Sequence, residues 1–186
     1  MDSYECWRNL LNDVLRGNGK EPLSREVFDA SWGQGPEADQ QMFFPDWTLE
    51  QVLRFYNRRF PDYTKWARTR PDVQTTLKKL KTGSKKLAVA SNSPTPIVRN
   101  LLSVTGLESY LDLLIGVDQV KHAKPSPDLL LFALQKLGLD LQDACYVGDS
   151  AFDEEAARAA GILFIGYKRQ GDLTIHSLEE LVTQSL

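Results

Sequence analysis

The stretch Val147-Gly148-Asp149-Ser150-Ala151-Phe152-Asp153 decides how this chain is expected to fold. The apolar run 144–147 precedes its acidic residues and the alanine-rich segment 154–161 follows them, a pattern that predicts a buried strand, a tight loop and a helix. Ligands of open α/β sheets bind where the strands end, and Asp149 and Asp153 could converge there on one hard cation such as Mg²⁺. The alternative is that Asp149 only caps the helix.

Two earlier strand-to-helix junctions also carry polar groups. The predicted strand 86–90 is followed by Ser91 and Asn92, which offer a hydroxyl and backbone N–H groups suited to an oxyanion. Lys124 lies just before the helix predicted over 127–137 and could neutralise a phosphate. Each signal is weak alone, because serines at strand ends and surface lysines are common. Their occurrence at successive junctions, together with the acidic loop, predicts a phosphate site.

The second part of the chain alternates helices and strands. This alternation, from Pro71 onward, predicts a doubly wound parallel sheet. Helices are predicted over 72–81, 96–104, 127–137 and 152–160, strands over 86–90, 113–117, 144–147 and 162–165, and a last helix from Ser177.

The first 70 residues show helical periodicity and no strong strand. Apolar residues from Tyr4 to Leu15 fall at helical spacing, a short helix is expected after Ser24, and Thr48 opens a third helix with a capping-box pattern. We therefore predict an all-helical domain over 1–70 and an α/β domain over 71–186.

In combination, these motifs resemble those of the haloacid dehalogenase superfamily, in particular its members similar to phosphoglycolate phosphatase. The resemblance implies a Rossmann-like core with a small helical cap. Ser91 matches the residue that hydrogen-bonds the transferring phosphoryl group, Lys124 matches the lysine that steadies phosphate and nucleophile, and Asp149 and Asp153 match the loop that holds Mg²⁺. Asn92 would add its N–H group to the phosphate site.

A glycine-rich loop in the cap is a further candidate, because in capped members of this superfamily such a loop can close over the active site. Here it begins with Trp32, Gly33 and Gln34, which the resemblance makes a substrate-selecting segment. The alternative is a plain turn with Trp32 packed in the core of the cap.

The superfamily's first motif has no match in this sequence. Members begin with an apolar strand that ends in Asp-x-Asp-Gly-Thr-Leu, whose first Asp is the nucleophile, whereas this sequence contains no Asp-x-Asp. Its opening, Met1 to Trp7, resembles the segment that follows that motif. We therefore expect a full-length parent that has the strand. We also expect a gap between strands 86–90 and 144–147 that is kept and filled by some polypeptide, because central parallel strands are buried on both faces.

Composition limits the function classes. The chain has 186 residues, of which 42% are hydrophobic and 25% charged, which is ordinary for a globular protein. A net charge of −3 argues against nucleic-acid binding, and no apolar run approaches the ~20 residues of a membrane span. Cys6 and Cys145 are far apart, and Cys145 is expected to be a small buried hydrophobe. These cysteines suggest a reducing compartment, most simply the cytoplasm.

The resemblance thus implies a Mg²⁺-dependent phosphatase that acts on a small phosphorylated metabolite through a phosphoaspartyl intermediate, with phosphoglycolate as the first substrate to consider. A dehalogenase uses the same nucleophile without a metal, and the pair Asp149 and Asp153 argues against it. The non-enzymatic alternative is a pseudo-phosphatase that keeps the phosphate pocket as a binding or regulatory protein.

Overall fold

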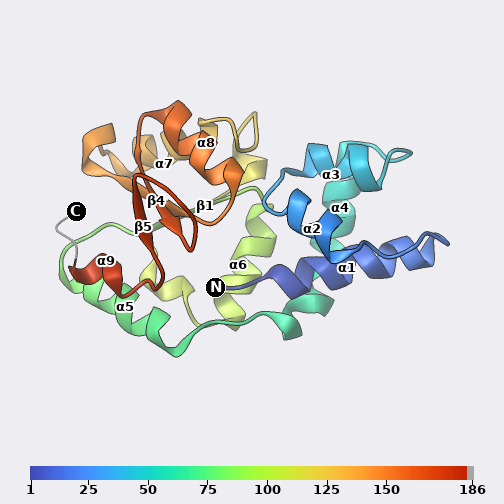
Figure 1. Ribbon diagram of the computed structural model, residues 1–186, viewed down its shortest axis with the longest axis horizontal. Coiled ribbons are helices and arrows are strands. Elements are labelled where there is room, and N and C mark those ends of the chain that lie inside the picture. Colours follow the sequence, from blue (N-terminus) through green and yellow to red (C-terminus); the bar gives the residue numbers. More distant parts are fainter. Residues whose placement is uncertain (184–186) are drawn as a thin grey trace.

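The computed structural model describes residues 1–183 and has a helical part beside an α/β part (Figure 1). The helical part contains α1 (Tyr4–Gly17), α2 (Arg25–Ser31), α3 (Pro36–Phe43), α4 (Leu49–Arg59) and the 3₁₀ segment η1 (Phe60–Trp66). The helix predicted from Thr48 is confirmed, since Thr48 and Gln51 form a reciprocal capping box. Helix α3 was not expected, because its residues follow glycines in a polar stretch; Pro36 at its first position favours the helical start.

The core of the helical part is aromatic and extends onto the α/β part. Phe28, Tyr56 and Phe60 are almost fully buried there, and Ile97 and Leu101 of the α/β part pack in the same cluster. Burying each such side chain contributes roughly 1.5 to 3 kcal/mol. The helical part is therefore held against the α/β part by shared apolar packing.

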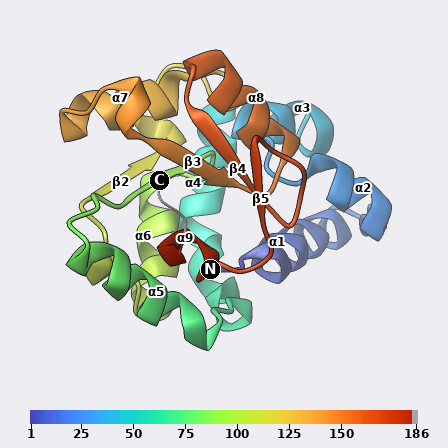
Figure 2. The ribbon, with the colours of Figure 1, turned by 60° about the vertical axis from the view of Figure 1, so that its left-hand side comes forward.

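The α/β part alternates helices with parallel strands, as the sequence predicts (Figure 2). Its strands are β1 (Ala88–Ser91), β2 (Leu113–Gly116), β3 (Cys145–Gly148), β4 (Leu163–Tyr167) and β5 (Leu173–Ile175). Its α-helices are α5 (Pro71–Thr82), α6 (Thr95–Val104), α7 (Asp128–Leu137), α8 (Ala151–Ala160) and α9 (Glu180–Thr183), and its short 3₁₀ segments are η2 (Glu108–Tyr110), η3 (Val117–Gln119) and η4 (Leu141–Asp143).

Helices cover both faces of these strands, which is the doubly wound arrangement. Leu130 of α7 and Ala156 of α8 share one apolar cluster with Phe164 of β4, whereas Val73 of α5 and Val98 of α6 share another. Helix α7 packs against β1 and β2 and also against α8, which itself packs on β3 and β4.

Two elements at the carboxyl end differ from the prediction. Strand β5 was missed because its three residues, Leu173 to Ile175, include a threonine and form no apolar run. Helix α9 begins three residues later than the predicted start at Ser177. The Glu180 carboxylate accepts hydrogen bonds from the backbone N–H groups of His176 and Ser177, at 2.9 and 2.8 Å, and so holds the segment before the helix in a turn.

The strands form two sheets. One has the order β1-β2 and the other the order β3-β4-β5, so β1 and β3 are not paired and the gap predicted between them is kept. Within residues 1–183 no strand fills that gap, contrary to the expectation of a polypeptide segment. The Tyr146 side chain crosses it instead: its hydroxyl lies 2.8 Å from Asp153 Oδ1, to which it donates, and 3.2 Å from the Ala90 carbonyl oxygen.

The exposure of β3 follows from this division. Cys145, expected to be buried, is exposed to solvent. It is the first residue of β3, and β3 has a partner strand, β4, on only one side. The prediction for Cys145 was therefore wrong. Cys6, in α1, is buried, and both thiols are free.

No helix within residues 1–183 combines the length and apolar character that crossing a membrane requires.

Candidate active site

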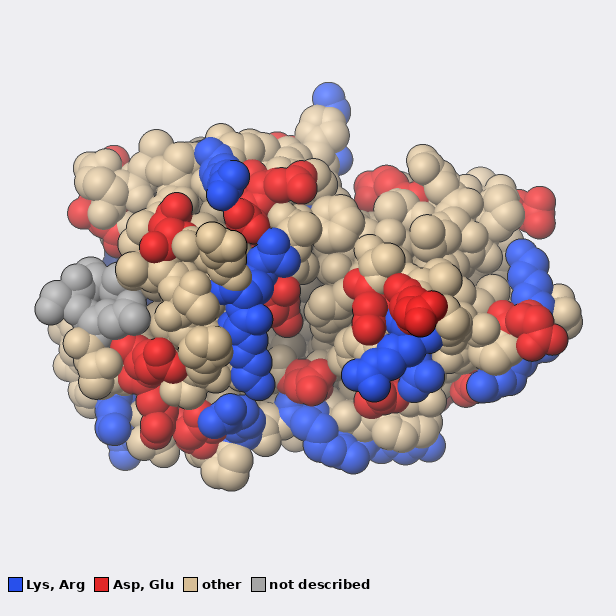
Figure 3. Space-filling view, in the orientation of Figure 1, with Lys and Arg blue, Asp and Glu red and all other residues tan. Residues whose placement is uncertain are grey.

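A cavity of about 170 Å³ lies between the helical part and the carboxyl ends of β1 and β3, where the surface is hollowed (Figure 3). The helical part contributes an apolar wall that includes Trp7, Phe28 and Tyr56, and the loops after the strands contribute a polar one. Every candidate site residue predicted from the sequence lines this cavity: Trp32, Gly33, Gln34, Ser91, Asn92, Lys124, Asp149 and Asp153.

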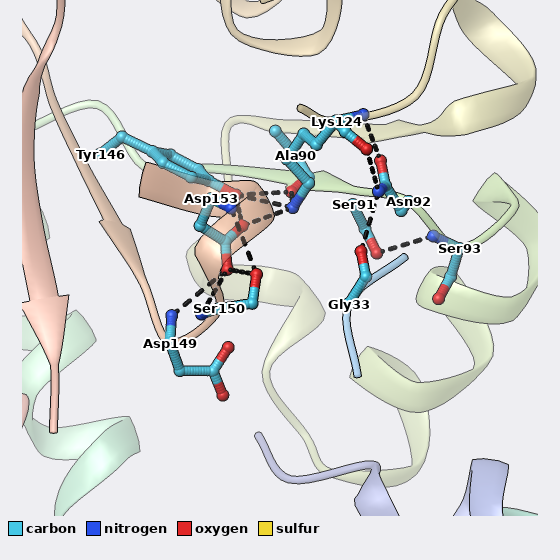
Figure 4. A network of polar contacts seen from close by, with 10 residues as sticks. All are labelled: Gly33, Ala90, Ser91, Asn92, Ser93, Lys124, Tyr146, Asp149, Ser150 and Asp153. Carbon is cyan, nitrogen blue, oxygen red and sulfur yellow. Dashed lines mark hydrogen bonds and ion pairs between the residues drawn. The ribbon is translucent and has the colours of Figure 1, made fainter. Parts of the chain in front are cut away.

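Lys124 is the centre of a buried polar cluster (Figure 4). Its ammonium group donates to Asp153 Oδ1 at 2.7 Å, to the Tyr146 hydroxyl at 2.9 Å and to the Ala90 carbonyl at 3.3 Å. Burial alone would lower the pKa of Lys124, but Tyr146 and the Asp153 carboxylate hold that pKa above its ordinary value. Because these three contacts engage the three N–H bonds of the ammonium group, Lys124 would act on a nearby phosphate mainly through its charge.

Asp153 is fully occupied by protein donors. Its second oxygen, Oδ2, accepts from the Ser150 hydroxyl at 2.6 Å and from the backbone N–H groups of Ser150 and Asp149 at 3.0 and 3.2 Å. Burial would raise the pKa of Asp153, but Lys124 and these hydrogen bonds hold it below its ordinary value. Ser150, not Asp149, is the N-cap of α8. The alternative in which Asp149 only caps the helix is therefore wrong.

Asp149, unlike Asp153, has an exposed carboxylate. Its carboxylate points away from that of Asp153 (Figure 4) and the residue is exposed to solvent. Desolvation by the cavity wall and the negative charge of Asp153 raise its pKa, although an interaction with the Trp32 side chain partly opposes the shift. No cation in the described chain pairs with Asp149 closely enough to form an ion pair, whereas Lys124 pairs with Asp153.

The acidic loop therefore fits a hard cation through one carboxylate. Mg²⁺ prefers oxygen ligands and keeps several waters, and the raised pKa of Asp149 marks negative charge that a cation would neutralise. Asp153 does not converge on the same point, because both of its oxygens are engaged. Among residues 1–183 no three His, Cys, Asp or Glu side chains gather in a metal-binding group.

The loop after β1 is hydrogen-bonded both to the Lys124 segment and to the loop that contains Gly33. The Asn92 side chain accepts from the Lys124 backbone N–H at 2.8 Å and donates to the Lys124 and Gly33 carbonyls at 3.0 and 2.9 Å. Both N–H bonds of its amide are thereby used, so Asn92 positions Lys124 and its backbone N–H is the donor left for a phosphate. The Ser91 hydroxyl accepts from the Ser93 N–H at 3.0 Å, and Ser91 is half-buried at the cavity wall.

The loop that begins at Trp32 joins the cap to these loops. The Trp32 ring lies 5.2 Å from Tyr4 and 5.8 Å from Phe28, as the core-packing alternative expected, and it also lines the cavity. Gly33 has φ +90°, and a Cβ there would lie 2.8 Å from Ser150 Oγ. Both interpretations of this loop thus have support in the geometry, and its role in substrate selection stays a prediction.

Two polar residues of the site were not found from the sequence. Tyr146 stands within an apolar strand, and its hydroxyl is the only local sign of a polar role. Asp39 lines the cavity from α3 and accepts hydrogen bonds from Gln34 and Tyr56. Nothing in the sequence around Asp39 signals this, because Tyr56 lies 17 residues away on another helix.

Comparison with known proteins agrees with this geometry. The chain is 30% identical over 161 residues to a phosphoglycolate phosphatase of Escherichia coli (strain K12), covering 81% of this chain and 63% of the relative. It is 43% identical over 163 residues to a phosphoglycolate phosphatase of Pectobacterium atrosepticum, covering 84% of this chain and 58% of the relative. The chain thus spans less than two thirds of the length of these relatives.

Solved structures show the same fold at lower sequence identity. A putative phosphoglycolate phosphatase from Lactobacillus plantarum superposes with a TM-score of 0.85 at 17% identity, covering 98% of this chain and 92% of the other. CbbY from Rhodobacter sphaeroides, solved with phosphate, gives a TM-score of 0.83 at 22% identity, with 97% and 90% covered. The sequence profile described as haloacid dehalogenase-like hydrolase matches residues 1–167. The chain therefore belongs to the haloacid dehalogenase-like hydrolase family.

Proposed function

We propose that this chain is the substrate- and metal-binding part of a Mg²⁺-dependent phosphatase for a small phosphomonoester. The observation that carries the proposal is that Ser91, Lys124 and Asp149, from three separate strand-to-helix junctions, line one cavity. The names of the relatives make phosphoglycolate the first substrate to assay. Two free thiols support a reducing location such as the cytoplasm.

In this proposal the chain's own residues bind and orient the phosphate. The Ser91 hydroxyl and the adjacent backbone N–H groups donate to phosphoryl oxygens, and the Lys124 ammonium stabilises negative charge on the transferring group. Asp153 fixes Lys124 through their ion pair. Asp149 would hold Mg²⁺, which supplies positive charge that offsets the repulsion between an attacking carboxylate and the phosphate.

Turnover requires a nucleophilic carboxylate in addition to these residues. An aspartate from the family's first strand would attack phosphorus and release the alcohol, and water would then hydrolyse the phosphoaspartate and return the free carboxylate. A pseudo-phosphatase is the second candidate, because this sequence contains no Asp-x-Asp.

Calorimetric titration with Mg²⁺ tests the metal assignment. We expect Asp149→Asn to weaken Mg²⁺ binding by at least about tenfold, since the open carboxylate is lost, and Asp153→Asn to weaken it much less. Asp143→Asn, which removes an exposed acidic residue outside the cavity, is the matched control and should bind as wild type. If all three variants bind Mg²⁺ as tightly as wild type, the assignment of Asp149 as a metal ligand is wrong.

A further inference from the structure

The cap end of the cavity presents one fixed carboxylate. Asp39, on α3, lines the cavity; its Oδ1 accepts from Gln34 Nε2 at 2.6 Å and its Oδ2 accepts from the Tyr56 hydroxyl at 2.7 Å. Tyr56 is only 1% exposed. The carboxylate is therefore anchored against a rigid part of the cap core and cannot turn away from the cavity without breaking these bonds.

Within residues 1–183, no cation lies close enough to Asp39 to form an ion pair with it. The charged side chains that line the cavity in the described chain are Asp39, Lys124, Asp149 and Asp153, and Lys124 is paired with Asp153 at 2.7 Å. The two groups that contact Asp39 are neutral donors. Burial raises the pKa of Asp39 to about 6, with the two hydrogen bonds opposing the rise, so the group carries a negative charge at neutral pH.

This arrangement discriminates between kinds of alcohol group on a phosphomonoester. Each carboxylate oxygen has two lone pairs, and Gln34 and Tyr56 engage one on each, so Asp39 can still accept a hydrogen bond from a ligand hydroxyl. A ligand carboxylate at the same place would bring two negative charges together with nothing to neutralise them. Such a repulsive element is a common source of specificity.

We propose that Asp39 makes the cap end of this cavity select phosphomonoesters with a neutral hydroxyl on the alcohol portion and reject those with a carboxylate there, phosphoglycolate included. The inference rests on the proposed function, because it assumes that the phosphate lies against Ser91 and Lys124. Asp39 is then a specificity-determining residue, and the phosphate contacts proposed for Ser91 and Lys124 stay the same.

Calorimetry on the full chain with Mg²⁺ tests this inference, using orthophosphate, glycerol phosphate and phosphoglycolate as ligands. Wild type should bind glycerol phosphate at least about tenfold more tightly than phosphoglycolate. Asp39→Asn keeps the shape of the side chain and removes its charge, and should narrow that ratio to about twofold. Asp46→Asn removes an exposed acidic residue of the cap outside the cavity and should leave the ratio as in wild type.

The choice of ligands distinguishes a failure of the proposed function from a failure of the Asp39 inference. If orthophosphate does not bind wild type, the proposed function fails and this inference fails with it. If orthophosphate binds but phosphoglycolate binds as tightly as glycerol phosphate, or the ratio is the same in Asp39→Asn, the inference alone is overturned.

The pH dependence of wild type gives a second measurement that needs no variant. Protonation of Asp39 below its pKa of about 6 removes the repulsion, so the preference for glycerol phosphate should be full near pH 8 and shrink near pH 5. The titratable groups that face Asp39 are Glu37 on its own helix and Tyr56 on α4. Ionisation of the phosphate is common to both ligands and largely cancels in the ratio. A ratio that does not change over this range would contradict the proposal.

Discussion

At the scale of single residues, the acidic loop holds two carboxylates in opposite environments. Asp153 is 5% exposed, and protein donors contact both of its oxygens. Asp149, four residues earlier, is exposed and has no ion pair in the described chain. Their spacing in the sequence suggested that both could approach one cation. Their surroundings show that Asp153 is engaged within the protein, and they leave Asp149 as the carboxylate proposed to bind a cation.

This contrast predicts different stabilities for the two asparagine variants. Asp153→Asn leaves the buried Lys124 ammonium without its ion pair, which should cost about 3 to 5 kcal/mol in the free energy of unfolding. Asp149→Asn should leave stability unchanged or slightly higher, because it removes a charge that is repelled by Asp153. Urea denaturation of both variants measures this, and equal losses would contradict it.

The contribution of the Asp153 carboxylate to the free energy of unfolding depends on pH. The pKa of Asp153 is lower in the folded protein than its ordinary value, so the ionised carboxylate stabilises the fold above about pH 4. This stabilisation is lost as the pH falls through the folded pKa, and wild type should then approach Asp153→Asn in stability.

At the scale of elements, the loop between α2 and α3 closes the cavity through close backbone approaches. A Cβ on Gly33 would lie 2.8 Å from Ser150 Oγ, and a Cβ on Gly35 would lie 2.5 Å from the Ala123 side chain. The Asn92 amide also donates to the Gly33 carbonyl. The loop between α2 and α3 thus packs directly against Ser150, Ala123 and Asn92, in the loops that carry the proposed phosphate and metal residues.

Gly33→Ala should lower stability by about 1 to 3 kcal/mol, because it combines overpacking with a backbone conformation that favours glycine. Gly17→Ala is the control, since no atom approaches within 4 Å of a Cβ there, and it should be neutral or mildly stabilising. Thermal unfolding compares them. Equal melting temperatures for the two variants would contradict this, because they would show that the loop accommodates the added methyl group without loss of stability.

The success of prediction at this scale depends on whether the signal is local. Strand β3 and helix α8 were predicted because an apolar run, a glycine and an N-cap pattern occur in succession. Helix α3 was missed because its residues follow glycines in a polar stretch, and strand β5 because its three residues form no apolar run. Asp39 was missed because its anchoring partner Tyr56 lies 17 residues away on another helix.

At the scale of the whole molecule, polar side chains connect the two sheets where strands do not. Tyr146, Lys124 and Asp153 join the β3 sheet to the Ala90 carbonyl of β1. The gap itself could be predicted from the absent Asp-x-Asp motif, but these contacts could not, because they depend on how side chains from separate strands meet.

We expect this chain to show no phosphatase turnover, since the proposed binding residues cannot replace a nucleophilic carboxylate. Losing such a nucleophile typically removes several orders of magnitude in rate. An assay with a chromogenic phosphate ester and Mg²⁺ checks this, and Asp149→Asn is the background control. Turnover in wild type that Asp149→Asn abolishes would show that another residue serves as nucleophile.

Helix α7 gives the divided sheet a consequence for the dynamics of the protein. Because α7 packs against β1, β2 and α8, it touches both halves, while the strands of one half share no backbone ladder with those of the other. The two halves can therefore open as separate cooperative units. In native-state hydrogen exchange, the amides of β2 and β4 should exchange with different opening free energies, and those of α7 should follow the more stable half.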